Sequence, residues 1–339
     1  MLYYLLPKIV NKIIVSPSDN MKECKLYISH SLYEYSKTMQ SKLKLIKNHT
    51  KDPIIDNYFL NKTQLYSESY SELFYELVEF FIASNNNHEC FITHPTNILC
   101  ITSHYNDAHN SIEFVKKKYN YTHTNSYTHF NNTMDYFNSH NIEKFDFMFF
   151  ELPVYNLQDV NQYIIHALQI VMIIMKTQSE NGCCLIKLNY IYHKPIIDIL
   201  FLLSSVYSNL YLIKPTLMNT TDCKYVFCKH FSNNPETSDQ NYKLLETFLQ
   251  KPDLQNVTHL IHYDTPAYFI YKINEINLII GQQQLELSRQ LLNIYMGQNQ
   301  LYKLDQYKQK NIQKWVDWCS KMNIPYNIVD DDCTCCSLE

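Results

Sequence analysis

Between residues 181 and 214 the chain reads NGCCLIKL (Asn181–Leu188), then KPIIDILFLLSSVY (Lys194–Tyr207), then NLYLIK (Asn209–Lys214). The first and third segments are short, nearly continuous apolar runs, which is typical of strands that are buried on both faces. The longer middle segment predicts a helix. Strand, helix and strand in this order form the unit from which parallel sheets are built, so these residues predict part of a parallel sheet.

The same alternation of apolar strands and amphipathic helices begins upstream, near residue 89. In the most apolar of these helices, residues recur at i, i+3 and i+4 spacing from Val160 to Met175, as on a helix that buries one stripe. The pattern predicts an α/β fold, a doubly wound and mostly parallel sheet with helices on both faces. The further strands are expected at Glu89–Thr93, Asn97–Thr102, Phe145–Phe150 and Lys224–Cys228, and the further helices at Asp107–Lys118 and Leu157–Thr177.

The regions on either side of this pattern differ from it. Residues 1–65 predict an α+β extension, with strands at Lys8–Val15 and Lys25–Ser29 and a helix at about Leu32–Lys47. A helix at Ser71–Ala83 opens the central domain, which we place at residues 66–231.

Residues 232–339 predict a helical extension, because strand signals become rare beyond residue 231. Helices are expected at Tyr242–Leu249, Glu275–Tyr295 and Tyr302–Lys321. The last of them carries Trp315 and Trp318 at helical spacing, and we interpret both as packing residues that hold these helices to the body of the protein.

Composition narrows the class of protein. Hydrophobic residues make up 46% of the chain and the net charge is −4, values typical of a globular protein that lacks strong non-specific affinity for phosphate. Its most apolar stretch, Tyr163–Met175, is shorter than the roughly 20 residues that a membrane helix needs. Because Met1–Val15 lacks the pattern of a signal peptide, the expectation is a chain that is neither secreted nor membrane-spanning, in a reducing compartment.

The eleven cysteines lack the regular spacing of a disulfide framework. Three of them, Cys333, Cys335 and Cys336, lie together near the end of the chain. A tetrahedral zinc site needs four ligands, and no second cluster accompanies these three. No metal site is therefore expected.

Several segments in the middle of the chain resemble, in their order, the motifs of FtsJ/RrmJ-like RNA 2'-O-methyltransferases, especially those of large DNA viruses. The resemblance covers residues 65–231 and implies a Rossmann-like methyltransferase fold, S-adenosyl-L-methionine as methyl donor, and an RNA cap or rRNA as substrate. The matching segments are Ser71–Glu79, Lys144–Leu152, Asn181–Leu188, Asn209–Thr216 and Asp222–Lys229.

The family's site is a Lys-Asp-Lys-Glu cluster whose central lysine, with a lowered pKa, helps to deprotonate a ribose 2'-hydroxyl. The equivalent positions here are Glu76, Glu151, Lys187 and Cys223. Lys187 alone is unchanged. Glu151 keeps the carboxylate with an extra methylene, Glu76 inverts the charge, and Cys223 removes a carboxylate that Asp222 can replace only if the strand shifts by one residue. The resemblance thus implies Lys187, Glu151 and Asp222 as the catalytic residues of an active enzyme.

Each of these residues also has a plainer interpretation. Lys187 can be a solvated lysine at a strand end, and Glu151 a loop carboxylate. Glu76 lies on the same predicted helix as Glu72 and Glu79, and we expect it on an exposed acidic face.

The expected cofactor site is the weakest part of the resemblance. S-adenosylmethionine needs a glycine-rich turn after the first strand, and no glycine precedes Gly182. Only His94-Pro95-Thr96 joins the first two predicted strands, which is too short for a crossover helix, so this helix is expected to be absent. Asp107 lies near the place for the cofactor ribose, although a helix N-cap is the favoured interpretation.

The leading hypothesis is a member of this family that has lost catalysis, binds no cofactor and acts as a regulatory or binding subunit with a protein partner in viral mRNA synthesis or capping. Its place would be the host cytoplasm or the virion. One alternative is an active RNA 2'-O-methyltransferase that binds S-adenosyl-L-methionine and RNA. The other is a structural component of the virion.

Overall fold

The computed structural model describes residues 1–20, 24–49, 63–64, 70–86, 96–139, 143–153, 160–216, 223–232, 234–252, 254, 256–296, 300–325 and 327–328. Its centre is a seven-stranded sheet of order β1-β8-β9-β7-β6-β4-β5. The strands in this order are Leu2–Leu5, Tyr207–Lys214, Lys224–Phe231, Gln178–Leu188, Phe145–Glu151, Asn97–Ile101 and Ser126–Phe130.

The sheet is mostly parallel. Strands β5, β4, β6 and β7 pair in parallel. Strand β9 is antiparallel to both β7 and β8, so β8 runs with the parallel strands, while β1 is antiparallel to β8. The order and the directions confirm the predicted sheet, and the predicted strands at Phe145–Phe150, Asn209–Lys214 and Lys224–Cys228 all lie in it.

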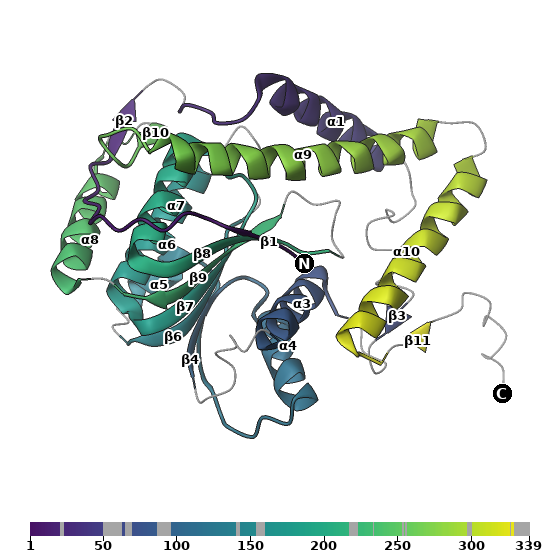
Figure 1. Ribbon diagram of the computed structural model, residues 1–339, viewed down its shortest axis with the longest axis horizontal. Coiled ribbons are helices and arrows are strands. Elements are labelled where there is room, and N and C mark those ends of the chain that lie inside the picture. Colours follow the sequence, from purple (N-terminus) through teal and green to yellow (C-terminus); the bar gives the residue numbers. More distant parts are fainter. Residues whose placement is uncertain are drawn as a thin grey trace.

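Helices cover both faces of the sheet (Figure 1), and alternate residues of each strand face the two layers. In β6, Phe147 and Phe149 belong to one hydrophobic cluster, and Met148 and Phe150 belong to the other. The doubly wound α/β architecture is thereby confirmed. One layer holds α3 (Glu72–Asn86), α4 (Tyr105–Lys118) and α10 (Gln300–Met322); the other holds α5 (Thr133–Asn138), α6 (Val160–Thr177), α7 (Lys194–Val206) and α8 (Pro235–Leu249).

Two long helices lie side by side along one edge of the molecule (Figure 1): α1 (His30–His49) and α9 (Ala267–Met296).

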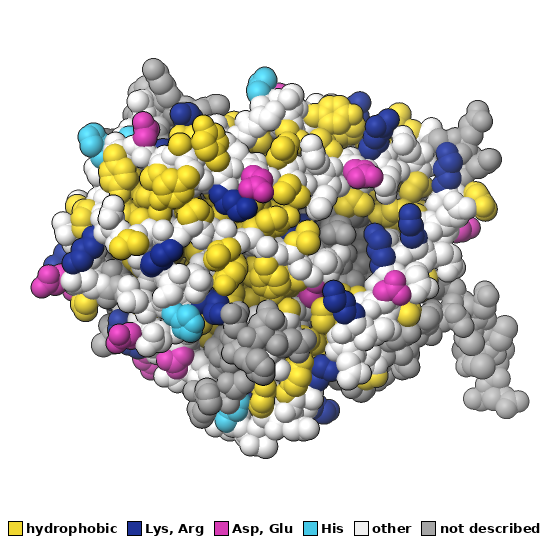
Figure 2. All heavy atoms as spheres, in the orientation of Figure 1, with side chains coloured by type: hydrophobic (Ala, Val, Ile, Leu, Met, Phe, Trp, Pro, Cys, Tyr) yellow, Lys and Arg dark blue, Asp and Glu magenta, His cyan; other side chains and the backbone are white. Residues whose placement is uncertain are grey.

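On the face shown in Figure 2, acidic and basic side chains are interspersed, which agrees with the nearly balanced charge of the chain. Two small antiparallel pairs complete the fold: β2 (Ser18–Asn20) with β10 (Asn256–His259), and β3 (Thr63–Gln64) with β11 (Asn327–Ile328). Within the described ranges, none of the helices has the length and apolarity needed to cross a membrane.

The strand predictions for residues 1–65 were wrong in position. The first strand is β1, and residues 8–15 form an irregular segment instead. Ile9, Ile13 and Val15 of this segment are buried, and a side chain replaces a strand partner: Asn241 accepts a hydrogen bond from the Val15 N–H and donates one to the Ile13 carbonyl, at 3.0 and 2.9 Å. The strand expected at Lys25–Ser29 is reduced to one bridge, between Leu26 and His193.

The helix predicted at Asp107–Lys118 is confirmed as α4, whereas the crossover helix that was expected to be absent would follow the strand predicted at Glu89–Thr93, in residues that the structure does not describe. Helix α4 connects β4 to β5, and these two strands are parallel neighbours. The strand predicted at Glu89–Thr93 lies outside the described residues. Sequence analysis overlooked β5, whose polar sequence SYTHF (Ser126–Phe130) carries little apolar signal.

Helix α10 is held to the body by an aromatic cluster, as predicted for its two tryptophans. Trp315 is fully buried and lies edge-on to Tyr75 of α3, with ring centroids 4.8 Å apart. Trp318 stacks on Trp315 at 5.1 Å. The C-terminal helix therefore closes the layer that contains α3.

We expect replacement of this tryptophan to destabilise the whole fold. Trp315→Ala should lower the free energy of unfolding by about 3–5 kcal/mol, because a large buried ring is lost and a cavity remains. Tyr302→Ala on the same helix removes a ring that is 66% exposed and should cost no more than about 0.5 kcal/mol. Urea unfolding of the two variants measures the difference, and equal midpoints would contradict the role assigned to Trp315.

Candidate functional site

The parallel strands change direction of winding between β4 and β6. Strand β4 leads through α4 to β5 on one side, and β6 leads through α6 to β7 on the other. In open α/β sheets, ligands bind outside the carboxyl ends of the strands at such a switch point. The residues at that place are Thr102-Ser103-His104 after β4 and Glu151 at the end of β6.

Side chains connect the two strand ends across this switch point. Glu151 accepts a hydrogen bond of 2.5 Å from the Thr102 hydroxyl, and its Oε2 lies 3.0 Å from His104 Nδ1. The Thr102 hydroxyl in turn accepts from the His104 N–H, and His129 Nε2 lies 3.0 Å from the Thr102 carbonyl oxygen. We call the contacts among Thr102, His104 and Glu151 the switch-point bridge.

Glu151 also belongs to an ion cluster, which we define as Glu76, Glu151 and Lys187; Glu76 is buried, whereas the side chains of Glu151 and Lys187 are 15% and 17% exposed. Glu151 and Lys187 are paired neighbours on β6 and β7, and Lys187 Nζ lies 3.4 Å from Glu151 Oε1. The same ammonium lies 3.0 Å from Glu76 Oε2 of α3. Tyr225 of β9 donates a hydrogen bond of 2.6 Å to that oxygen. The cluster thus joins one helix to three strands.

The expected exposure of Glu76 was wrong. Glu76 is 2% exposed and Glu79 is fully buried, because α3 lies between the sheet and the helices α4 and α10. Both carboxylates have partners in the interior. Those of Glu79 are the backbone N–H and hydroxyl of Thr216 and the terminal ammonium of Met1, 2.8 Å away.

The fourth family-equivalent position, Cys223, lies beside the cluster. Its thiol is buried and interacts electrostatically with Glu76 and Lys187, and burial raises the pKa of this thiol to about 12. A neutral thiol adds no negative charge to the cluster. The structure thus brings Glu76, Glu151, Lys187 and Cys223 together, whereas Asp222 lies outside the described residues.

The cluster favours its charged forms. Burial alone would lower the pKa of Lys187, but Glu76 first, then Cys223 and Glu151, raise that pKa above its ordinary value. Burial alone would raise the pKa of Glu151, but Lys187 and the hydrogen bonds from Thr102 and His104 bring that pKa below its ordinary value. At neutral pH this lysine is an ammonium ion held between carboxylates.

Asp107 does not cap its helix, so that expectation was wrong. Helix α4 begins at Tyr105, its N-cap is His104, and Asp107 lies in the first turn. A carboxylate there interacts favourably with the positive end of the helix dipole. Its contact with a cofactor ribose stays a prediction.

The turn at the switch point lacks the glycines that the sequence resemblance leads us to expect at an S-adenosylmethionine site. Close approach of backbone to a ligand requires glycine, and the turn is Thr102-Ser103-His104. Positive φ angles in the described residues other than glycine occur at Asn120, Asn181, His230 and Asn323, so this turn has an ordinary backbone. The side chains of the switch-point bridge also lie between the ends of β4 and β6, where a ligand of an α/β sheet would bind.

Sequence analysis missed Thr102, His104 and Tyr225. Each contacts a carboxylate that is distant in sequence, and nothing in the spacing of the histidines marked His104. The one available signal in the sequence was the polar pair Thr102-Ser103 directly after the apolar strand β4, at a strand end where site residues often lie.

The lowered pKa of Glu151 predicts a pH-dependent loss of stability. The folded-state pKa lies below the ordinary 4.5, so the carboxylate stabilises the fold above about pH 4.5 and this contribution disappears as the pH falls through the folded-state value. Glu151→Gln should be less stable than the parent by about 1–3 kcal/mol at pH 7, and the gap should narrow as the pH falls below about 4.5. Urea midpoints between pH 3 and 7 measure it, with exposed Glu180→Gln as the control; a gap that stays constant over this range would contradict the assignment.

Comparison with known proteins does not change the assignment of the fold. No family model matches the chain, and no curated protein matches it. Among solved structures, it is similar to human methyltransferase-like protein 13 in complex with SAH, with 14% sequence identity and a TM-score of 0.26 over 52% of this chain and 93% of that chain. A likeness at this level supports no conclusion about chemistry, and the fold assignment rests on the strand order: the chain has a Rossmann-like, doubly wound α/β fold.

Proposed function

We propose that this chain is a degenerate methyltransferase-fold protein that does not transfer methyl groups and acts as a binding or regulatory subunit. The observation that carries the proposal is the position of the Lys187 ammonium, 3.0 Å from Glu76 and 3.4 Å from Glu151. In FtsJ-like enzymes, as the sequence resemblance implies, a lysine occupies the position of Glu76.

A lysine that helps to remove a proton from a ribose hydroxyl must itself lose its proton near neutral pH. A neighbouring cation and burial lower the pKa of a lysine, whereas neighbouring carboxylates raise it. The replacement of a lysine by Glu76 therefore reverses the electrostatic effect on Lys187. Held in this way, Lys187 donates hydrogen bonds to carboxylates and is not available as a base.

The switch-point bridge supports the second half of the proposal, that the chain does not use S-adenosylmethionine. Thr102, His104 and Glu151 contact one another where a ligand of an α/β sheet would lie. Binding would have to break these contacts and leave the buried side of Glu151 without its hydrogen bonds, which is costly.

The proposed partner follows from the resemblance to viral FtsJ-like proteins. We propose that the chain binds a protein of mRNA synthesis or capping, close to RNA, in the host cytoplasm or in the virion. Under the proposed division at residues 65 and 231, the C-terminal helices would be available for such a partner.

An active RNA 2'-O-methyltransferase is the second candidate, favoured by the convergence of all four family-equivalent positions and by the presence of α4. In that case Lys187, Glu151 and Asp222 would carry the reaction.

Calorimetry and methyl transfer separate the two candidates. Titration of the full chain with S-adenosylmethionine should give no heat of binding, and radiolabelled donor should transfer nothing to capped RNA. Micromolar binding that is lost when bulky residues replace Ser103 and His104 would overturn the proposal. His104→Ala removes one contact of the switch-point bridge and serves as a matched variant. Like the parent, it should neither bind S-adenosylmethionine nor transfer a methyl group.

A structural role for Lys187 predicts a specific pattern of stability. Lys187→Met leaves Glu76 buried without its ion partner and should cost about 3–5 kcal/mol. Adding Glu76→Gln should recover most of that loss, because the double variant contains no unpaired charge at this contact. Thermal or urea unfolding of the two single variants and the double variant gives the coupling; purely additive losses would show that the ion pair does not stabilise the fold.

A further inference from the structure

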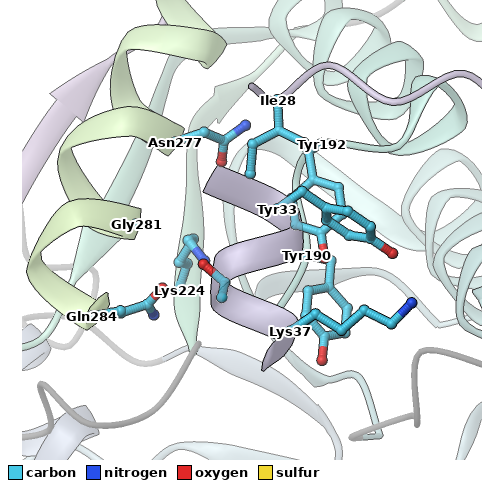
Figure 3. Close-up of a pocket in the computed structure, with 10 residues that line it drawn as sticks. Ile28, Tyr33, Lys37, Tyr190, Tyr192, Lys224, Asn277, Gly281 and Gln284 are labelled. Carbon is cyan, nitrogen blue, oxygen red and sulfur yellow. The ribbon is translucent and has the colours of Figure 1, made fainter. Parts of the chain in front are cut away.

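A second site lies away from the switch point, between helices α1 and α9. The loop after β7 and the start of β9 complete it, and its enclosed space is about 40 Å³. Figure 3 shows its lining side chains coming from both helices and from the sheet. Those that matter for its chemistry are Tyr33, Ser36, Tyr190, Lys224, Asn277 and Gln284.

Asn277 has a buried donor without a partner. The residue lies on α9 and is 4% exposed, and within the described part of the chain its Nδ2 has no hydrogen-bond acceptor. In Figure 3 its amide points from α9 into the space beside α1. A buried donor left unsatisfied costs about 1–3 kcal/mol, and a ligand oxygen in the pocket would remove that cost.

One buried lysine, Lys224, lines the pocket, whereas the ammonium of Lys37 points away from α9 in Figure 3. The described lining includes Lys37 and Lys224 and no acidic residue, although the chain as a whole carries a net charge of −4. Lys224 is 5% exposed and donates a hydrogen bond of 2.9 Å to the Asn189 carbonyl. An ammonium so little exposed to water interacts more strongly with an anion than a surface lysine does.

Tyrosine rings form the wall opposite α9. Tyr192 lies 5.6 Å from both Tyr33 and Tyr190, centroid to centroid. Such rings offer a surface to a planar group and hydroxyls to an acceptor.

We propose that this pocket binds a phosphate group, either as the free ion or as the end of a small phosphate monoester. Donors reach it from three elements: Ser36 of α1, Lys224 of β9 and Asn277 of α9. Donors converging from different directions suit a tetrahedral oxyanion, and lysine binds phosphate as a point charge. The enclosed volume, a few times the roughly 10–15 Å³ that one water needs, matches a single such group. The inference goes beyond the proposed function and does not depend on it.

Calorimetry on the full chain tests the proposal, with inorganic phosphate, glycerol phosphate and adenosine monophosphate as the ligands. We expect saturable binding of phosphate. Tighter binding of adenosine monophosphate than of glycerol phosphate would identify a ring-bearing monoester as the source, and equal affinity for all three would identify the free ion. The absence of saturable binding for all three would overturn the proposal.

Three variants assign the binding to this pocket. Asn277→Asp keeps the shape but places a carboxylate against the anion, and it should weaken binding at least tenfold. Asn277→Leu removes the unsatisfied donor, so the fold should be kept while binding is lost; the thermal midpoint checks the fold. Lys272→Met, on the same helix but outside the described lining, should bind like the parent. Unchanged affinity in both Asn277 variants would overturn the proposal.

Discussion

The contact on which the site depends is the ion cluster of Glu76, Lys187 and Glu151. A lysine and two glutamates in the interior are tolerable only together, because each charge loses its hydration and regains interaction from the others. The cluster joins α3 to β6 and β7, and Tyr225 extends it to β9. The two carboxylates hold Lys187 as an ammonium ion, which limits the chemistry that this lysine can perform at this edge of the sheet.

The switch-point bridge follows from the same cluster. Glu151 faces Lys187 with one oxygen and Thr102 and His104 with the other. One carboxylate thus connects the ion cluster to the strand ends where an α/β sheet offers a ligand site. A doubly wound sheet can place residues at this position for catalysis or simply for stability, and the difference lies in the charges that surround the lysine.

The second pocket shows how the two long helices add to the fold. Helices α1 and α9 come from opposite ends of the chain and lie side by side over the loop after β7 (Figure 1). The sheet supplies Lys224, α1 supplies Tyr33 and α9 supplies Asn277. The position of this pocket shows that the extensions do more than cover the core: together with the sheet they enclose a small pocket that Lys224 and Asn277 line.

Sequence alone determined most of the regular structure, because the apolar runs of the buried strands and the 3.6-residue stripe of helices such as α6 are local patterns. It missed β5, whose polar residues carry no such pattern. It gave Lys187, Glu151 and Cys223 as equivalent positions but expected Glu76 on the surface. Only the tertiary structure decided that Glu76 is buried against Lys187, since α3 is enclosed by the sheet, α4 and α10. The physical reason is general: periodicity reports how a segment faces its own neighbours, whereas the charge state of a buried lysine depends on carboxylates that the fold brings from more than one distant part of the chain.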